Sequence, residues 1–258
     1  MKKCIDRVSS LSHKNILFIV EGGKTEPSLL RRLNKIIGFE NYKIFSYNTC
    51  IYELFHELNK DDDLDLILTL KESAQSTSEK QILSQKYVSI YLIFDFDPHY
   101  QKYSKSTLKD MIEYFNNSYD RGKLYINYPM MESFRHLTTM PDHDFLHRKV
   151  SMEGLTKYKE TVGHESSYTE MNKYNYPIVT QIIAHHLIKY HYLTKAKPFS
   201  PTLNEFENFN ATTDKKLLDI QDHQVQNGWI SIINTSVFYI VDLKPKSFFG
   251  AQLTNFEL

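Results

Sequence analysis

The chain has 258 residues, 41% of them hydrophobic and 14% aromatic, which is enough to fill a core and excludes wholesale disorder. Its 31 basic and 31 acidic residues cancel, which argues against a protein that coats nucleic acid through a broad basic surface, though not against an enzyme that grips it locally. We expect neither a membrane span nor a signal peptide, because no sufficiently long apolar run is present. With two cysteines, Cys4 and Cys50, a disulfide framework is not expected and the predicted setting is the cytoplasm.

The first predicted element is a strand at Ile16–Val20, whose uninterrupted apolar side chains are typical of a strand covered on both faces. A helix is predicted at Glu26–Gly38, where leucine and isoleucine recur at helical spacing. Thr25 is its predicted N-cap, Pro27 suits its first turn and Gly38 ends it. A short strand and a short helix are predicted next, at Tyr42–Tyr47 and Cys50–Leu58.

The following stretch is harder to assign from its pattern. We expect a solvated loop at Asn59–Asp65, a helix or a loose connection at Leu64–Leu70, and an exposed insertion at Lys71–Gln85. A buried strand, a helix and a third apolar strand are then predicted at Tyr87–Phe94, Thr107–Asn116 and Leu124–Tyr128. This β–α–β order predicts an α/β fold with a parallel sheet flanked by helices.

The pattern changes after Pro129. Three helices are predicted, at Met130–Leu137, Ile178–Tyr192 and Leu203–Asp219, while Ser236–Val241 could be a strand. We therefore expect two parts, an α/β domain over residues 14–138 and a mainly helical C-terminal lobe over residues 139–258.

Acidic residues fall where the predicted strands end. Glu21 follows the first strand, Asp95 and Asp97 end the strand before Pro98, and Glu132 comes shortly after the third. Alternation along an extended chain puts the two aspartates on one side, about 7 Å apart. Because ligands bind beyond the carboxyl ends of parallel strands, the four carboxylates are predicted to converge at one edge of the sheet.

Such a cluster of acids needs a positive partner, because like charges raise one another's pKa values. Carboxylate oxygens favour hard divalent ions, so the expected cofactor is Mg²⁺ or Mn²⁺. Gly22 and Gly23 would let the backbone turn tightly and approach a phosphate, ahead of a helix N-terminus that favours anions.

A strand ending in Glu-Gly and a later strand ending in Asp-x-Asp resemble a Toprim domain, the metal-binding module of type IA and II topoisomerases, bacterial primases and OLD-family nucleases. Within it, IVEGGKTEPSLLRRL is similar to the opening of RloB-like proteins found with bacterial anti-phage loci. The resemblance covers roughly residues 14–138. The long segment before the Asp-x-Asp strand departs from the pattern. The chain also has no recognisable topoisomerase tyrosine, zinc-ribbon cysteines or Walker motif, so any ATPase would be a separate subunit.

The resemblance implies roles for individual residues. It implies that Glu21 is a general acid/base or metal-associated residue, that Asp95 and Asp97 bind metal, and that Glu132 is the further acid of nuclease-type members. OLD-type nucleases also use a lysine beyond their acids, a role that Lys159 could fill.

Each of these residues also has a plainer interpretation. Glu21 could cap a helix dipole, Asp95 and Asp97 could form a solvated turn, and Glu132 could suit a first helical turn. Lys159 could be a solvated linker lysine. His143 and His147 have a zinc-like spacing but are expected to be surface residues, and His185, His186 and His191 are expected to be ordinary interface residues. His99, two residues after Asp97, could touch a phosphate or metal, or could be a loop histidine with no role.

Three functions stay open from the sequence. The first is a metal-dependent nuclease or phosphodiesterase, set by the resemblance in anti-phage defence. The second is a non-catalytic Toprim-like module that binds nucleic acid or a protein partner. The third is a nucleotidyl or phosphoryl transferase using the same acids, because the metal chemistry is shared. The sequence does not distinguish DNA from RNA as the nucleic acid.

Overall fold

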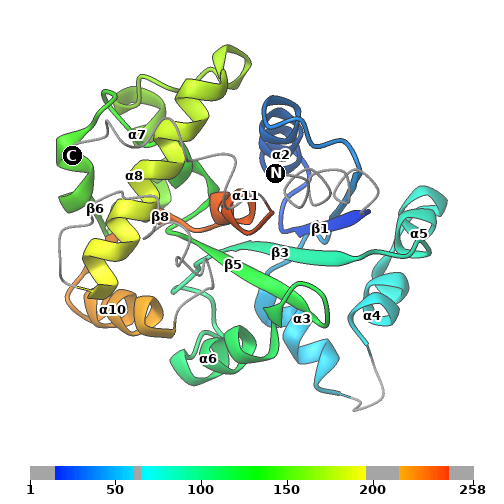
Figure 1. Cartoon of the computed structure of the whole chain (residues 1–258). Helices are drawn as coiled ribbons and strands as arrows, with labels where there is room; N and C mark the ends of the chain where they lie inside the picture. Colours follow the sequence, from blue (N-terminus) through cyan, green and yellow to red (C-terminus); the bar gives the residue numbers. More distant parts are fainter. Residues whose placement is uncertain (1–14, 61–64, 196–214, 244–258) are drawn as a thin grey trace. The chain divides into compact units, whose positions relative to one another are not determined.

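The computed structural model describes residues 15–60, 65–195 and 215–243. The protein has an α/β fold with a mostly parallel central sheet flanked by helices, as predicted (Figure 1). Its residues group into two compact units. Of the described residues, those within 1–94 and 110–125 form unit 1, and those within 95–109 and 126–258 form unit 2.

Unit 1 is built around strand β1 (Ile16–Val20), whose five residues are all buried. Two neighbours pair with it in parallel: β2 (Tyr42–Ser46) on one side and β3 (Ser89–Asp95) on the other. The strand order continues as β2-β1-β3-β5-β4, where β5 is Gly122–Tyr128 and β4 (Asn116–Asn117) is antiparallel to it. The predicted strands are therefore present, and the parallel pairs bring the carboxyl ends of β1, β2 and β3 to one edge.

Helix α2 (Thr25–Ile36) packs leucines 29, 30 and 33 into the core, as the sequence spacing predicts. Thr25 is its first residue rather than its N-cap. The N-cap is Lys24, and no side chain there caps the helix, so that prediction is wrong. Gly38 follows the helix with φ +67°, the left-handed conformation that glycine adopts without strain.

Three further helices follow β2: α3 (Ile51–Leu58), α4 (Leu66–Ser73) and α5 (Thr77–Leu83). They pack in series, α3 on α4 and α4 on α5, and α5 returns to β2. Residues 71–85 are largely exposed, as expected, but they are not an insertion set apart from the fold, because α5 packs on α4 and on β2. Ser76 and Glu79 form a capping box that starts α5, a local signal present in the sequence.

The chain passes from one unit to the other inside two strands and a helix, whereas the sequence predicts a single boundary between residues 138 and 139. The chain leaves unit 1 after Phe94, returns at Asp110 inside α6 (Lys105–Tyr114), and leaves again after Tyr125 inside β5. The reason lies in long-range pairing. The end of β5 pairs antiparallel with β8 (Ile233–Asn234), more than one hundred residues later, which no local pattern encodes.

Unit 2 is organised by α8 (Tyr176–Lys195), which contacts α10 (Lys215–Gln226), β8 and the 3-10 helices η1, η2 and η5. Helix α7 (Tyr158–Glu165) packs on η1 and η3. Strands β6 (Lys149–Ser151) and β7 (Trp229–Ser231) form a small antiparallel pair. The 3-10 helices are η1 (Met131–Arg135), η2 (His143–His147), η3 (Leu155–Lys157), η4 (Met171–Lys173) and η5 (Ser236–Phe238).

Several expectations for this part need correction. The segment Ser236–Val241 is not a strand, because η5 and α11 (Tyr239–Leu243) occupy it; a short run buried on every side does not distinguish the two states. The predicted helix at Met130–Leu137 is only the 3-10 helix η1. The predicted helix at Leu203–Asp219 lies outside the described residues up to 214, and α10 begins at Lys215. Residues 61–64 of the predicted loop also lie outside the described residues.

In the part of the chain that the structure describes, no helix combines the length and the apolar character that a membrane crossing requires.

Candidate functional site

Glu21 lies at the carboxyl end of β1, where backbone hydrogen bonds hold it on two sides. Its N–H donates to the carbonyl of Ile93 in β3 (3.2 Å), and its carbonyl accepts from the N–H of Asn48 beyond β2 (2.8 Å). Asn48 adopts φ +61°, which asparagine tolerates better than most residues. The Glu21 backbone is thus fixed between the two strands that flank β1, and its side chain is half-buried.

The two glycines after Glu21 have a structural cause. A Cβ atom on Gly22 would lie 2.8 Å from a carboxylate oxygen of Glu26, which is itself only 8% exposed. A Cβ on Gly23 would lie 3.3 Å from the side-chain oxygen of Asn48. Gly22 therefore makes room for a carboxylate of the same turn. The phosphate approach that the sequence suggests for Gly22 and Gly23 stays a prediction.

Asp95 is the last residue of β3, and in unit 2 its carboxylate is held by a buried amide. The Asn127 side-chain NH₂ donates to Oδ1 of Asp95 (3.2 Å), and the Asn127 carbonyl accepts from the N–H of Phe96 (2.9 Å). Asn127 is fully buried, and its own side-chain oxygen accepts from the N–H of Ser236. Asp95 is therefore positioned by a rigid neighbour.

Asp97 is exposed and shapes the turn that follows β3. Its Oδ1 accepts from the N–H of His99 (3.1 Å), and its carbonyl accepts from the N–H of Tyr100 (3.3 Å). Phe96 between the aspartates is buried against Tyr103 and Tyr128, so it points away from them, as alternation predicts. The plainer interpretation of Asp97 as a turn residue is thus supported, and its exposed carboxylate still has acceptor capacity.

The structure brings two of the predicted site residues into contact, although 27 positions separate them. Glu132, in η1, is 4% exposed, and its Oε1 lies 3.0 Å from Nζ of Lys159 at the start of α7. The Lys159 side chain is 66% exposed. Lys159 is therefore solvated, as the plainer interpretation expects, but it lies in a helix and compensates the charge of a buried carboxylate.

A histidine that the sequence analysis missed lies beside this pair. His136 Nε2 is 2.8 Å from Oε2 of Glu165, and its Nδ1 is 3.1 Å from the hydroxyl of Tyr158. Burial lowers the pKa of His136 despite the neighbouring Glu165, so the ring is neutral at pH 7. Burial, and then the charge of Glu132, raises the pKa of Tyr158. Nothing local in the sequence marks His136, because its partners come from α7.

Two histidines of α8 are structural. His186 donates from Nε2 to the carbonyl of Phe134 (3.2 Å) and accepts at Nδ1 from the N–H of Asn234 (3.0 Å). Burial lowers its pKa to about 3. His185 uses both ring nitrogens in the same way, with the carbonyl of Gln181 and the N–H of Asp142. Both rings are fully buried, and neither has a nitrogen left for a metal.

No protein-family model, curated protein or solved structure matches this chain. The Toprim-like resemblance therefore rests on the sequence motifs and on an α/β fold that is compatible with it.

The donor chemistry of these residues suits a hard cation in part. Within the described ranges, no group of three or more His, Cys, Asp and Glu side chains could hold a metal ion. Mg²⁺ commonly needs only one or two carboxylates, with water and substrate phosphate completing its shell, which Asp95 and Asp97 can provide. Glu132 fits less well because Lys159 already serves as its cation. Glu21 belongs to the other unit, so the convergence of all four acids stays a prediction.

Proposed function

We propose that the chain is a Toprim-type phosphodiesterase that acts on nucleic acid with Mg²⁺ or Mn²⁺. The observation that supports it best is in the sheet: β1 and β3 are neighbouring parallel strands in register, Val20 opposite Ile93. An acid follows β1 directly and another ends β3, which is the edge where open α/β sheets bind ligands. When bound, the metal would supply Lewis acidity and a lowered pKa for a coordinated water.

The roles of the residues follow from their surroundings. Asp95, fixed by Asn127, is the positioned ligand, and Asp97 is the adaptable one because its carboxylate is exposed. Glu21 serves as the general acid/base at the end of β1. Lys159 is held at one side by Glu132 and is exposed on the rest of its ammonium group, which suits contact with a substrate phosphate.

The setting of this proposal follows from the resemblance. The substrate would be DNA or RNA, the process bacterial anti-phage defence in the cytoplasm, and the partner a separate ATPase subunit.

A specific observation favours a second candidate, a non-catalytic module that binds nucleic acid or a partner. Glu132 is neutralised by Lys159, and Asp97 is used in a turn. If these are purely structural tasks, too few free carboxylates remain for hydrolysis.

The test is incubation of the intact protein with supercoiled DNA, single-stranded DNA and tRNA, each with Mg²⁺ or Mn²⁺. Asp95→Asn keeps the size of the side chain and removes its charge, and Asp144→Asn is the matched control because Asp144 is exposed in η2. We expect cleavage by the wild type and by Asp144→Asn, and its loss in Asp95→Asn. Cleavage that persists in Asp95→Asn would refute the proposed site, and binding without cleavage would favour the second candidate.

A further inference from the structure

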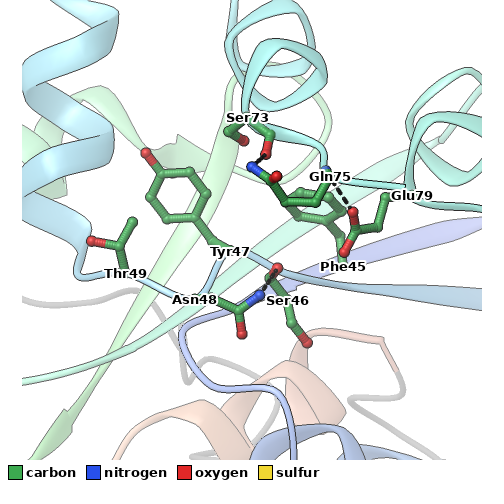
Figure 2. A pocket seen from close by; sticks show the side chains of 8 residues that line it. All are labelled: Phe45, Ser46, Tyr47, Asn48, Thr49, Ser73, Gln75 and Glu79. Atoms are coloured by element: carbon green, nitrogen blue, oxygen red, sulfur yellow. Dashed lines mark hydrogen bonds between the residues drawn. The ribbon is translucent and has the colours of Figure 1, made fainter. Parts of the chain in front are cut away.

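Unit 1 contains a pocket of about 310 Å³ beyond the carboxyl end of β2 (Figure 2). One wall is the end of β2 and the segment after it, with Tyr47, Asn48 and Thr49. The opposite wall comes from the end of α4 and the start of α5, with Ser73, Gln75 and Glu79. The volume lies at the lower end of the range for small-ligand sites, so the pocket admits a single ring system rather than a chain.

The groups that line this pocket exclude an anion. No Lys, Arg or His is among them, and Glu79 contributes a carboxylate. Burial, followed by the negative charges of Glu57 and Glu53, raises the pKa of Tyr47 to about 12, so its hydroxyl keeps its proton at pH 7. A phosphate would be repelled here, whereas a neutral polar ring would not.

The hydrogen-bonding groups of the pocket are both donors and acceptors. Among the described residues, the hydroxyls of Tyr47 and Thr49 have no hydrogen-bond partner. The side-chain NH₂ of Gln75 is used on the carbonyl of Ser73 (3.1 Å), which leaves its oxygen as the acceptor for a ligand. The Glu79 carboxylate accepts from the N–H groups of Gln75 and Ser76, so it is fixed in place.

The pocket is joined to the Glu21 turn through the backbone. The Tyr47 N–H donates to the carbonyl of Val20 (2.8 Å), and the Asn48 N–H donates to that of Glu21 (2.8 Å). Asn48 is then held by its own side chain, which donates to the carbonyl of Ser46 (3.1 Å; Figure 2). A ring in the pocket would therefore sit one strand away from the acid that follows β1.

We propose that this pocket binds an unpaired nucleobase. A nucleobase is a neutral planar ring with donors and acceptors on its edge, and it stacks on aromatic side chains such as that of Tyr47. Bases inside a duplex are stacked and paired, so only a single-stranded segment or a flipped nucleotide can enter. This inference deepens the proposed function, on which it rests, because it names the substrate class as nucleic acid with an unpaired base near Glu21.

The test measures binding without turnover. The intact protein, in buffer that contains a metal chelator, is titrated into fluorescein-labelled single-stranded DNA, single-stranded RNA and a duplex of the same sequence. Binding is recorded as the change in fluorescence anisotropy. Unlabelled nucleosides and inorganic phosphate serve as competitors. Tyr47→Ala removes the stacking ring, and Thr49→Trp fills the pocket without removing a described hydrogen bond. Tyr119→Ala is the matched control, because Tyr119 is an exposed tyrosine of unit 1 outside the pocket.

We expect single strands to bind more tightly than the duplex, and nucleosides but not phosphate to compete. Tyr47→Ala and Thr49→Trp should each weaken strand binding by about tenfold or more, with Tyr119→Ala unchanged. Equal affinity of the pocket variants and the wild type would overturn the inference, as would an absence of strand binding. The binding assay requires no cleavage, so weaker strand binding by the pocket variants supports the inference even if the wild type cleaves nothing in the nuclease assay. If the pocket variants instead bind and cleave strands as the wild type does, the inference is refuted while the proposed function stands.

Discussion

The two units keep their structure by different means. In unit 1, β1 is wholly apolar and buried, and aromatic rings stack from strand to strand, Phe18 of β1 on Tyr91 of β3 and Tyr91 on Tyr125 of β5. In unit 2, the core around α8 contains ionisable groups with no exposure, including Lys189, His185 and His186. Unit 1 thus depends mainly on apolar burial, whereas unit 2 adds to its own apolar core a set of hydrogen bonds between buried polar groups far apart in the sequence.

The buried charges of unit 2 are satisfied individually. Lys189 donates to the carbonyls of Phe145 (2.8 Å) and Arg148 (2.6 Å), and burial lowers its pKa well below the usual value. Asp142 is 1% exposed and pairs with Arg148 at 2.7 Å. It also accepts from the N–H and hydroxyl of Thr138. We therefore expect that removing one partner of a polar pair lowers the free energy of unfolding more in unit 2 than in unit 1.

The largest effect is expected from Asp142→Ala. Loss of this carboxylate removes the counter-ion of the partly buried Arg148, which keeps its hydrogen bond to the carbonyl of His136, and leaves the Thr138 N–H without its acceptor. The free energy of unfolding should therefore fall by about 3–5 kcal/mol. Urea denaturation measures it. The matched change in unit 1 is Glu57→Ala, which breaks the exposed pair with Lys60 and should cost less than about 1 kcal/mol. Equal costs would break the comparison.

Acid should destabilise unit 2 selectively. Burial lowers the folded pKa of His186 to about 3, below its unfolded value of 6.5, so the unfolded state binds more protons in between. The contribution of His186 to the free energy of unfolding therefore falls as the pH drops from about 6.5 towards 3, by about 1.4 kcal/mol for each pH unit. Burial lowers the pKa values of His136 and His185 as well, and both belong to unit 2. Hydrogen-exchange protection of α8 should fall before that of β1; simultaneous loss would argue for one cooperative unit.

The apolar core of unit 1 should be sensitive to volume instead of charge. Gly122 opens β5 with φ +108°, and a Cβ there would lie 2.5 Å from Cδ1 of Leu92. Gly122→Ala should therefore cost about 1–3 kcal/mol through strain and overpacking. Gly163→Ala is the control in unit 2, because a Cβ there meets nothing within 4 Å. Thermal unfolding of both variants measures the difference, and an unchanged melting temperature for Gly122→Ala would contradict this account of the unit 1 core.

The smallest effect is expected for the Glu132–Lys159 pair, which is buried at one end only. Lys159→Met leaves the Glu132 carboxylate uncompensated and should lower the free energy of unfolding by about 1 kcal/mol at pH 7. Adding Glu132→Gln should recover most of that loss, because the remaining group is neutral. A double-mutant cycle measures the coupling, and additive effects would show that the two side chains do not interact.

The sequence predicts most of unit 1 because its signals are local. Apolar runs mark β1, β3 and β5, and the leucine spacing marks α2. The capping box of α5 is a local signal too, although Ser76 lies in a stretch whose polar composition predicts an insertion. The contact of Glu132 with Lys159, and the His136 bonds to Tyr158 and Glu165, could not be predicted, because they depend on how α7 packs on η1. The four-acid convergence stays a prediction for another reason, because Glu21 belongs to unit 1 and the other three acids to unit 2.

The passage of the chain between the units within β3 and β5 has a consequence for synthesis on the ribosome. Unit 1 lacks residues 110–125 until they emerge, and the segment 95–109, made earlier, must wait for partners such as Asp219 and Asp222, which pair with Lys105. A nascent chain therefore carries an unfinished piece of unit 2 while unit 1 folds. It also follows that neither unit can be excised as one continuous fragment. A chain that stopped at residue 138 would lack β8, the strand that pairs with the end of β5.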